Sequence, residues 1–105
     1  MGGEVDDLDE VLDRLASMAV SRARLAADRL HFARVRKLGR VSSKAVYMLL
    51  KDHEPQSLAS FKRILGLSKS SAIRARDELV ERGFVTRDEQ FTYWLAPFTR
   101  EELDE

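Results

Sequence analysis

The N-terminal third of the chain repeats apolar residues at helical spacing. Between Glu4 and Leu38 there is neither Gly nor Pro, and Ala, Leu and Arg dominate, a composition that favours helix. One apolar stripe recurs every three or four positions, at Leu8, Leu12, Leu15, Ala19, Ala23, Ala26 and Leu30. The apolar face of this helix is too long for the rest of the chain to cover. We expect residues 1–38 to form one long dimerisation helix; the alternative is a break near residues 20–24 that folds this segment into a hairpin.

Further helical patterns follow between breakers. Gly39 ends the first segment, and Ser42 or Ser43 can cap a helix from Lys44 to about His53. Pro55 stops this helix, because proline disfavours helix in the residue before it.

Two shorter helical segments come next, each preceded by a serine. Ser57 can cap a helix over Leu58–Leu65, which ends at Gly66. Ser68 can cap another over Lys69–Arg82. Only three residues separate these two helices, which makes them neighbours in space.

Beyond Gly83 the pattern changes to strands. Phe84–Arg87 and Phe91–Leu95 predict a hairpin. Alternation divides the second strand into one face with Phe91, Tyr93 and Leu95 and another with Thr92 and Trp94. For Trp94 we expect packing under the long helix or a partner, with exposure as the alternative. Thr99 and Glu102 have capping-box spacing for a short terminal helix.

These elements predict a mainly α fold with a small β-hairpin. We expect residues 1–38 as the long helix, residues 39–98 as a helix-turn-helix domain with the hairpin, and residues 99–105 as a short helix or tail.

The turn between the third and fourth helices has the requirements of a helix-turn-helix motif. Gly66 allows a sharp bend, Leu67 fills the gap between the helices, and Ser68 caps the second helix. This cap leaves the helix N-terminus open to a phosphate.

This segment resembles the winged helix-turn-helix regulators of the MarR type. The residues that match in order and spacing are Ser68, Ser71, Arg74, Asp77, Leu79, Gly83 and Val85. The resemblance covers about residues 41–97. It implies that the 69–82 helix enters the major groove of duplex DNA and that the hairpin, as a wing, touches the DNA backbone.

A helical wheel of the 69–82 segment separates a core face from an outer face. Ala72, Ala75 and Leu79 share the core face, whereas Ser70 and Arg74 lie opposite. The DNA-contact residues that we expect are Ser68, Lys69, Ser70, Ser71, Ile73, Arg74, Arg87, Arg36, Lys37 and Arg40.

Three features depart from the family pattern. Arg76 stands where the family places an aliphatic core residue, so we expect it to snorkel or to pair with an acid. The distal half of the helix is acidic, and the hairpin tip is Asp88-Glu89. Only the first two helical turns can then approach DNA.

Formal net charge is zero, but its distribution is uneven. Residues 1–13 hold six acids and no base, residues 14–51 ten bases and one acid, and residues 52–105 eight bases and eleven acids. The basic block can contact phosphates, or it can pair with the acidic segment of a neighbouring chain. Both interpretations stay open.

Composition excludes other classes of function. The chain has no Cys, and its two histidines, His31 and His53, have no metal-ligand companion at useful spacing. We expect no enzyme activity, cofactor or metal. No signal peptide or membrane-spanning segment is evident, so we expect a cytoplasmic protein. The absence of Asn and Cys hints at a thermophilic, archaeal source.

The sequence thus predicts a dimeric protein that binds duplex DNA, as a transcriptional regulator. The rival is a winged helix that binds another protein within a larger replication, transcription or membrane-remodelling assembly. Net neutrality, the acidic hairpin tip and Trp94 favour the rival, whereas the basic block and the Ser/Arg helix start favour DNA.

Overall fold

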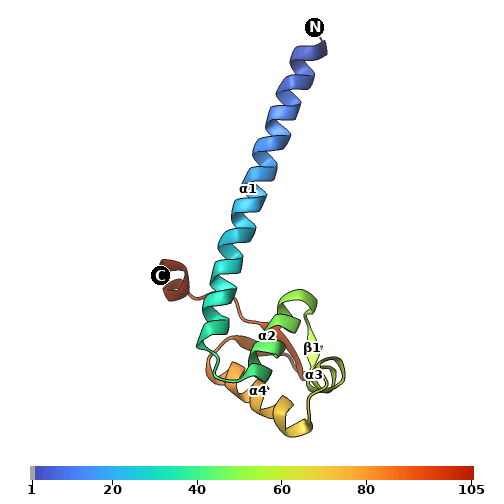
Figure 1. Ribbon diagram of the computed structural model, residues 1–105, viewed down its shortest axis with the longest axis vertical. Coiled ribbons are helices and arrows are strands. Elements are labelled where there is room, and N and C mark those ends of the chain that lie inside the picture. Colours follow the sequence, from blue (N-terminus) through green and yellow to red (C-terminus); the bar gives the residue numbers. More distant parts are fainter. Residues whose placement is uncertain (1) are drawn as a thin grey trace. The chain divides into compact units, whose positions relative to one another are not determined.

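The structure, a computed structural model, describes residues 2–105, with side chains from Asp7 onward (Figure 1). It confirms a mainly helical chain with a small antiparallel sheet. The elements of this described part are α1 (Gly2–Lys37), α2 (Val41–His53), β1 (Gln56–Ser57), α3 (Leu58–Leu65), α4 (Lys69–Glu81), β2 (Val85–Arg87), β3 (Thr92–Leu95) and α5 (Arg100–Asp104). The alternative of a break near residues 20–24 is wrong, since α1 continues through them.

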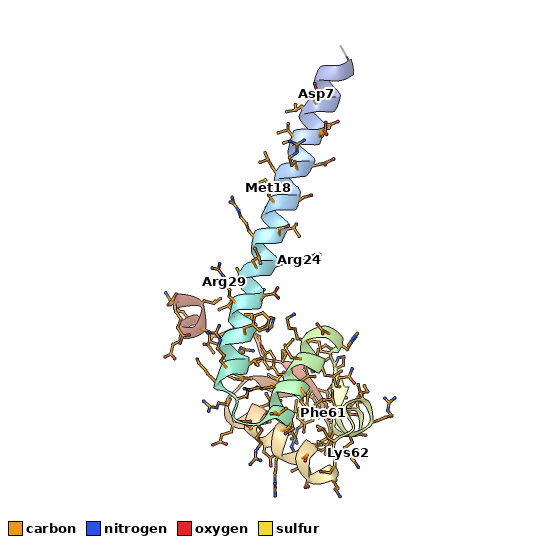
Figure 2. All side chains as sticks on the ribbon, in the orientation of Figure 1. Asp7, Met18, Arg24, Arg29, Phe61 and Lys62 are labelled. Atoms are coloured by element: carbon orange, nitrogen blue, oxygen red, sulfur yellow. The ribbon has the colours of Figure 1, made fainter. Side chains whose placement is uncertain are left out.

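The chain divides into two compact units, one ending at Phe32 and the other covering Ala33–Glu105. In the first unit, every side chain of α1 from Asp7 to Ala26 is exposed (Figure 2). Large apolar residues are among them. Within the described residues, no helix is both long enough and apolar enough to cross a membrane.

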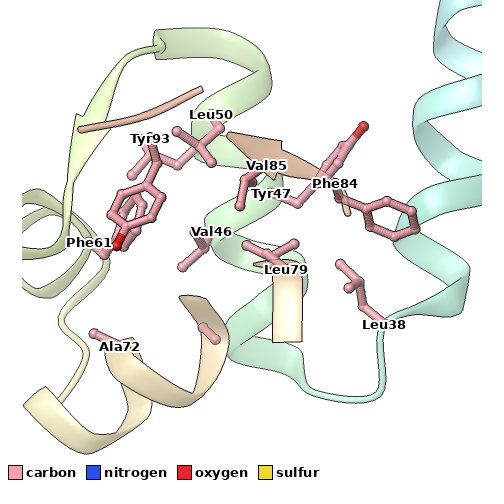
Figure 3. Close-up of a cluster of buried hydrophobic side chains, with 12 residues drawn as sticks. Leu38, Val46, Tyr47, Leu50, Phe61, Ala72, Leu79, Phe84, Val85 and Tyr93 are labelled. Carbon is pink, nitrogen blue, oxygen red and sulfur yellow. The ribbon is translucent and has the colours of Figure 1, made fainter. Parts of the chain in front are cut away.

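The core of the second unit is an apolar cluster centred on α2 (Figure 3). Its members are Leu38, Val46, Tyr47, Leu49, Leu50, Phe61, Ala72, Ala75, Leu79, Phe84, Val85 and Tyr93. Two aromatic pairs lie within it, Tyr47 with Phe84 at 6.2 Å between ring centroids and Phe61 with Tyr93 at 5.7 Å. Helix α2 packs against both α4 and β3, so it positions the motif helices relative to the sheet.

Helix α2 begins at Val41, earlier than the predicted Lys44. The expected cap at Ser42 or Ser43 is wrong. Arg40 occupies the N-cap position and makes no side-chain capping bond, while Ser43 is completely buried in the first turn of the helix.

The cap of α2 comes instead from α4. The Glu78 carboxylate accepts the backbone N–H of Gly39 at 2.7 Å and that of Arg40 at 3.4 Å. A carboxylate at a helix N-terminus satisfies unpaired N–H groups and complements the helix dipole. Because Glu78 is 39 residues from Gly39, no local pattern could reveal this cap.

The serine caps and glycine stops of α3 and α4 are confirmed. Ser57 accepts the N–H of Ser60, and Ser68 accepts that of Ser71. Gly66 has φ of 65°, a left-handed conformation that glycine adopts without strain. Helix α4 ends at Glu81, one residue before the predicted Arg82, which is its C-cap residue.

The sheet has three strands in the order β1-β3-β2, all antiparallel. The two longer strands confirm the predicted hairpin. Strand β1 was not predicted, because its two polar residues, Gln56 and Ser57, carry no strand pattern of their own. It forms because β3 offers its other edge, where Gln56 faces Tyr93.

The second strand is shorter than predicted and begins at Thr92. Phe91 belongs to the turn, with φ of 61° and 62% exposure, so its expected place on one face with Tyr93 and Leu95 is wrong. The cause is Asp88, whose carboxylate accepts the N–H groups of Gln90 and Thr92 and draws Phe91 into the turn.

The terminal helix α5 is confirmed. Thr99 accepts the N–H of Glu102, and Glu102 accepts the N–H of Thr99, completing the capping box.

Candidate nucleic-acid interface

The first turn of α4 brings several of the predicted contact residues together. Ser68 Oγ lies 3.1 Å from Ser71 N, 3.0 Å from Ser71 Oγ and 3.3 Å from Ser70 Oγ. Ser68, Lys69 and Ser70 are exposed. A helix N-terminus with exposed hydroxyls and a lysine suits a negatively charged group.

Helix α4 has the two faces that its sequence predicts. Ala72, Ala75 and Leu79 are buried, and this confirms the core face. Arg74 is exposed on the other side, one turn beyond Ser70. Ile73 is half-buried, so less of its side chain is available than the prediction assumed.

Two bases of α3 precede this helix start along the chain, and the sequence prediction overlooked them. Lys62 and Arg63 are exposed, and Figure 2 shows Lys62 at the surface. Residues 58–76 hold five bases and no acid. This acid-free stretch, which spans α3, the turn and the first half of α4, is the sequence signal that could have identified Lys62 and Arg63 as candidate contacts.

In the distal half of α4, the charge of Arg76 is neutralised by an acid of the same helix. Arg76 pairs with the neighbouring Asp77 at 2.9 Å, as the expectation of an acid partner allowed. The pKa of Arg76 is raised, mainly by its hydrogen bond to Asp77 and then by one to Tyr93. This part of the helix therefore offers little net positive charge.

Arg87 lies beside a hollow between α4 and the hairpin. The lining residues are Arg76, Asp77, Val80, Val85, Arg87 and Tyr93. The Arg87 guanidinium lies 4.6 Å from the centroid of the Phe91 ring, which holds it over the ring by a cation–π contact. Arg87 is exposed and thus accessible on this flank of α4.

Arg40 lies on the other flank of α4. It lines a shallow hollow with Arg74, Asp77, Glu78 and Glu81. Arg40 and Arg74 therefore come together as predicted, but three carboxylates share their surroundings.

The carboxylate of Glu78 in this hollow remains charged. Partial burial raises its pKa, but the Ser43 hydroxyl and the N–H groups of Gly39 and Arg40 lower it further, so the net pKa is lowered. Ser43 Oγ makes no hydrogen bond of good geometry, so the two N–H groups are the donors that keep the Glu78 carboxylate charged.

Arg36 and Lys37 do not join the start of α4. Both are exposed in the last turn of α1. Lys37 pairs with Glu105 at 3.7 Å and lines a hollow with Arg82 and Gly83, at the C-terminal end of α4. The ten predicted contact residues are therefore not gathered on one surface.

At the hairpin tip, the carboxylate of Asp88 accepts hydrogen bonds from residues of the same turn. The pKa of Asp88 is lowered chiefly by hydrogen bonds from the side chain and backbone of Thr92, with a smaller contribution from the Trp94 side chain. Asp88 thus stabilises the turn through these hydrogen bonds. Trp94 is 40% exposed, which agrees with the alternative of exposure, and its packing under a partner stays a prediction.

No family model, curated protein or solved structure matches this chain. Among the residues that the structure describes, no three His, Cys, Asp or Glu side chains are grouped so that they could hold a metal ion.

Proposed function

We propose that the chain is a winged helix-turn-helix protein that binds duplex DNA as a homodimer. In this proposal α3, its turn and α4 form the motif, α4 enters the major groove, and β2 and β3 form the wing. The residues of α1 before Phe32 pair with those of a second copy. A role in transcriptional regulation fits this arrangement.

The observation that carries the proposal is the acid-free, Ser-capped start of α4. Lys69, Ser70 and Arg74 are exposed there, on the side away from the buried Ala72 and Ala75. A helix inserted N-terminus first uses such side chains for base edges, while its N–H groups and neighbouring bases meet phosphates. Lys62 and Arg63 supply further charge for the DNA backbone.

The acidic distal half of α4 limits how deeply the helix inserts. Asp77 lines the hollows on both flanks of the helix, so phosphates approaching Arg40 and Arg87 meet a carboxylate between them. We therefore assign base contacts to the first two turns, and backbone contacts to the flanking arginines.

An electrophoretic shift on mixed-sequence duplex DNA at two salt concentrations tests DNA binding. The affinity should fall steeply with salt, because each phosphate contact contributes about 0.9 to the log–log slope. Lys69→Gln should lower this slope by roughly one such increment. A wild-type affinity that does not depend on salt would contradict the proposal.

Arg74→Ala tests the assignment of base reading. The variant should lose about 1–3 kcal/mol of binding free energy on a preferred sequence and relax the sequence preference. Arg100→Ala, at the exposed start of α5, is the matched control and should bind like the wild type. An equal loss on all sequences would make Arg74 a phosphate contact instead.

A protein partner is the second candidate function. The acidic hairpin tip and the exposed Phe91 and Trp94 favour it, because a wing that touches phosphate would carry bases. If neither the wild type nor any variant shifts DNA, this candidate replaces the first.

A further inference from the structure

The exposed stripe of α1 in the first unit is uneven in side-chain size. Its six central positions lie within about 80° of one another at 3.6 residues per turn, and they are Leu8, Leu12, Leu15, Ala19, Ala23 and Ala26. All six are exposed, and the leucines are 54–60% exposed. The stripe is therefore bulky in its N-terminal half and thin in its C-terminal half.

We infer that this stripe pairs with the stripe of a second copy in antiparallel orientation. The inference rests on the proposed homodimer and adds its direction. Parallel pairing would set each residue against its own counterpart, with leucine layers at one end and alanine layers at the other. Since the distance between packed helices follows the size of the side chains between them, such a pair could not pack closely along its whole length.

The antiparallel register sets a large residue opposite a small one in three of its layers. With Leu8 opposite Ala26, Val11 lies opposite Ala23 and Leu15 opposite Ala19. Alternation of large and small side chains across facing positions fills the space between helices evenly. The unequal halves of the stripe are then complementary.

Charge selects the same orientation. Residues 7–13 hold four acids and no base, and in this register they face residues 21–27 of the other copy, which hold Arg22 and Arg24 and no acid. Arg22 lies across from Leu12, so its apolar stem can cover the leucine while the guanidinium reaches the acids. Parallel pairing would set the acidic segments side by side, where like charges repel.

Disulfide trapping distinguishes the two orientations, because the chain has no cysteine of its own. Leu8→Cys and Ala26→Cys are prepared separately, mixed, oxidised gently and weighed by mass spectrometry. We expect the mixed Leu8→Cys/Ala26→Cys disulfide to dominate, and each variant alone to remain uncrosslinked. Ser17→Cys, exposed on the opposite side of the helix, is the control and should not crosslink.

Two outcomes would overturn the inference. Crosslinking of each variant with itself, without the mixed product, would show a parallel pair and leave the proposed dimer intact. A monomer in light scattering would remove both the dimer and its orientation. The electrophoretic shift on the same proteins tests DNA binding separately. Loss of DNA binding can therefore be distinguished from loss of the dimer or of its antiparallel orientation.

Charge reversal provides a second test without cysteine. Arg22→Glu with Arg24→Glu should weaken the dimer several-fold at low salt. Adding Asp9→Arg and Asp13→Arg to the same chain should restore it, because the two reversed segments face each other again. In a parallel pair, the first change would only replace one like-charge contact with another, so the dimer should not weaken and there would be nothing for the second change to restore.

Discussion

Arg34 is the most deeply buried of the charged side chains in the second unit. Its guanidinium is 1% exposed, donates to Glu102 Oε2 at 2.6 Å and Oε1 at 2.9 Å, and also donates to the carbonyls of Ala96 and Pro97. The Phe98 ring lies 4.4 Å away. Burial lowers the pKa of Arg34, but hydrogen bonds with Glu102 and Tyr47 raise it overall, so this arginine stays charged inside the protein.

Arg34→Ala should lower the free energy of unfolding by about 3–5 kcal/mol, because it leaves a partly buried carboxylate and two carbonyls without their donor. Urea unfolding measures the loss. Arg36→Ala, on the same turn and exposed, should change stability by less than about 0.5 kcal/mol. Equal stability of the two variants would show that the buried pair contributes nothing.

Glu102 makes stability depend on pH. Hydrogen bonds from Arg34, opposed by partial burial, lower its pKa from 4.5 to about 2. A group whose pKa is lower in the folded state stabilises the fold above its unfolded value and loses that contribution as pH falls through the folded value. The stabilisation by Glu102 should therefore be complete above about pH 4.5 and disappear toward pH 2.

The difference in unfolding free energy between the wild type and Glu102→Gln isolates this effect. Glutamine keeps the capping box but cannot ionise, so the difference should shrink between pH 4.5 and 2. Glu101→Gln, an exposed neighbour, is the control and should show no such trend. A difference independent of pH would contradict the role of the Arg34 pair.

At the scale of elements, Glu78 ties α4 to the start of α2. Its carboxylate holds the backbone N–H groups of the connection from α1 to α2. The proposed recognition helix and this connection are therefore joined directly, and the junction does not depend on side-chain packing alone.

Glu78→Ala should destabilise the protein by about 0.5–2 kcal/mol, the usual cost of losing an N-terminal cap. Thermal or urea unfolding measures it, and amide exchange at Gly39 and Arg40 should accelerate. Glu81→Ala, one turn further along and exposed, should leave both unchanged. If the two variants behave alike, the cap is not the stabilising feature.

At the scale of the whole molecule, the compact second unit begins within α1. Val35 and the buried Leu38 pack on the core, and Arg34 holds α5. The last turn of α1 is thus part of the proposed DNA-binding domain.

Two truncations test this boundary. A chain of residues 33–105 should unfold cooperatively, because it keeps all three of these contacts. A chain of residues 39–105 should be less stable by at least about 3 kcal/mol, since it loses a buried leucine and the partner of Glu102. Circular dichroism during urea unfolding compares them. Equal stability would place the boundary after Leu38 instead.

The sequence by itself determined the elements whose signals are local. Ser57, Ser68 and Thr99 cap helices because each accepts an N–H only three residues ahead. Gly66 and Gly83 end helices because their own backbones adopt positive φ. The side of α4 that faces the core also followed from helical spacing alone. Predictions of this kind held because the cause and the effect lie within one or two turns.

Tertiary structure alone decided the features whose partners are distant in sequence. Glu78 lies 39 residues from Gly39, and Glu102 lies 68 residues from Arg34. The pattern of residues 14–51 presents Arg34, Arg36 and Lys37 as equivalent bases, yet only the first is buried. The sequence shows that the helix carries an arginine. Which carboxylate that arginine pairs with depends on which distant residue the packed core brings within hydrogen-bond reach.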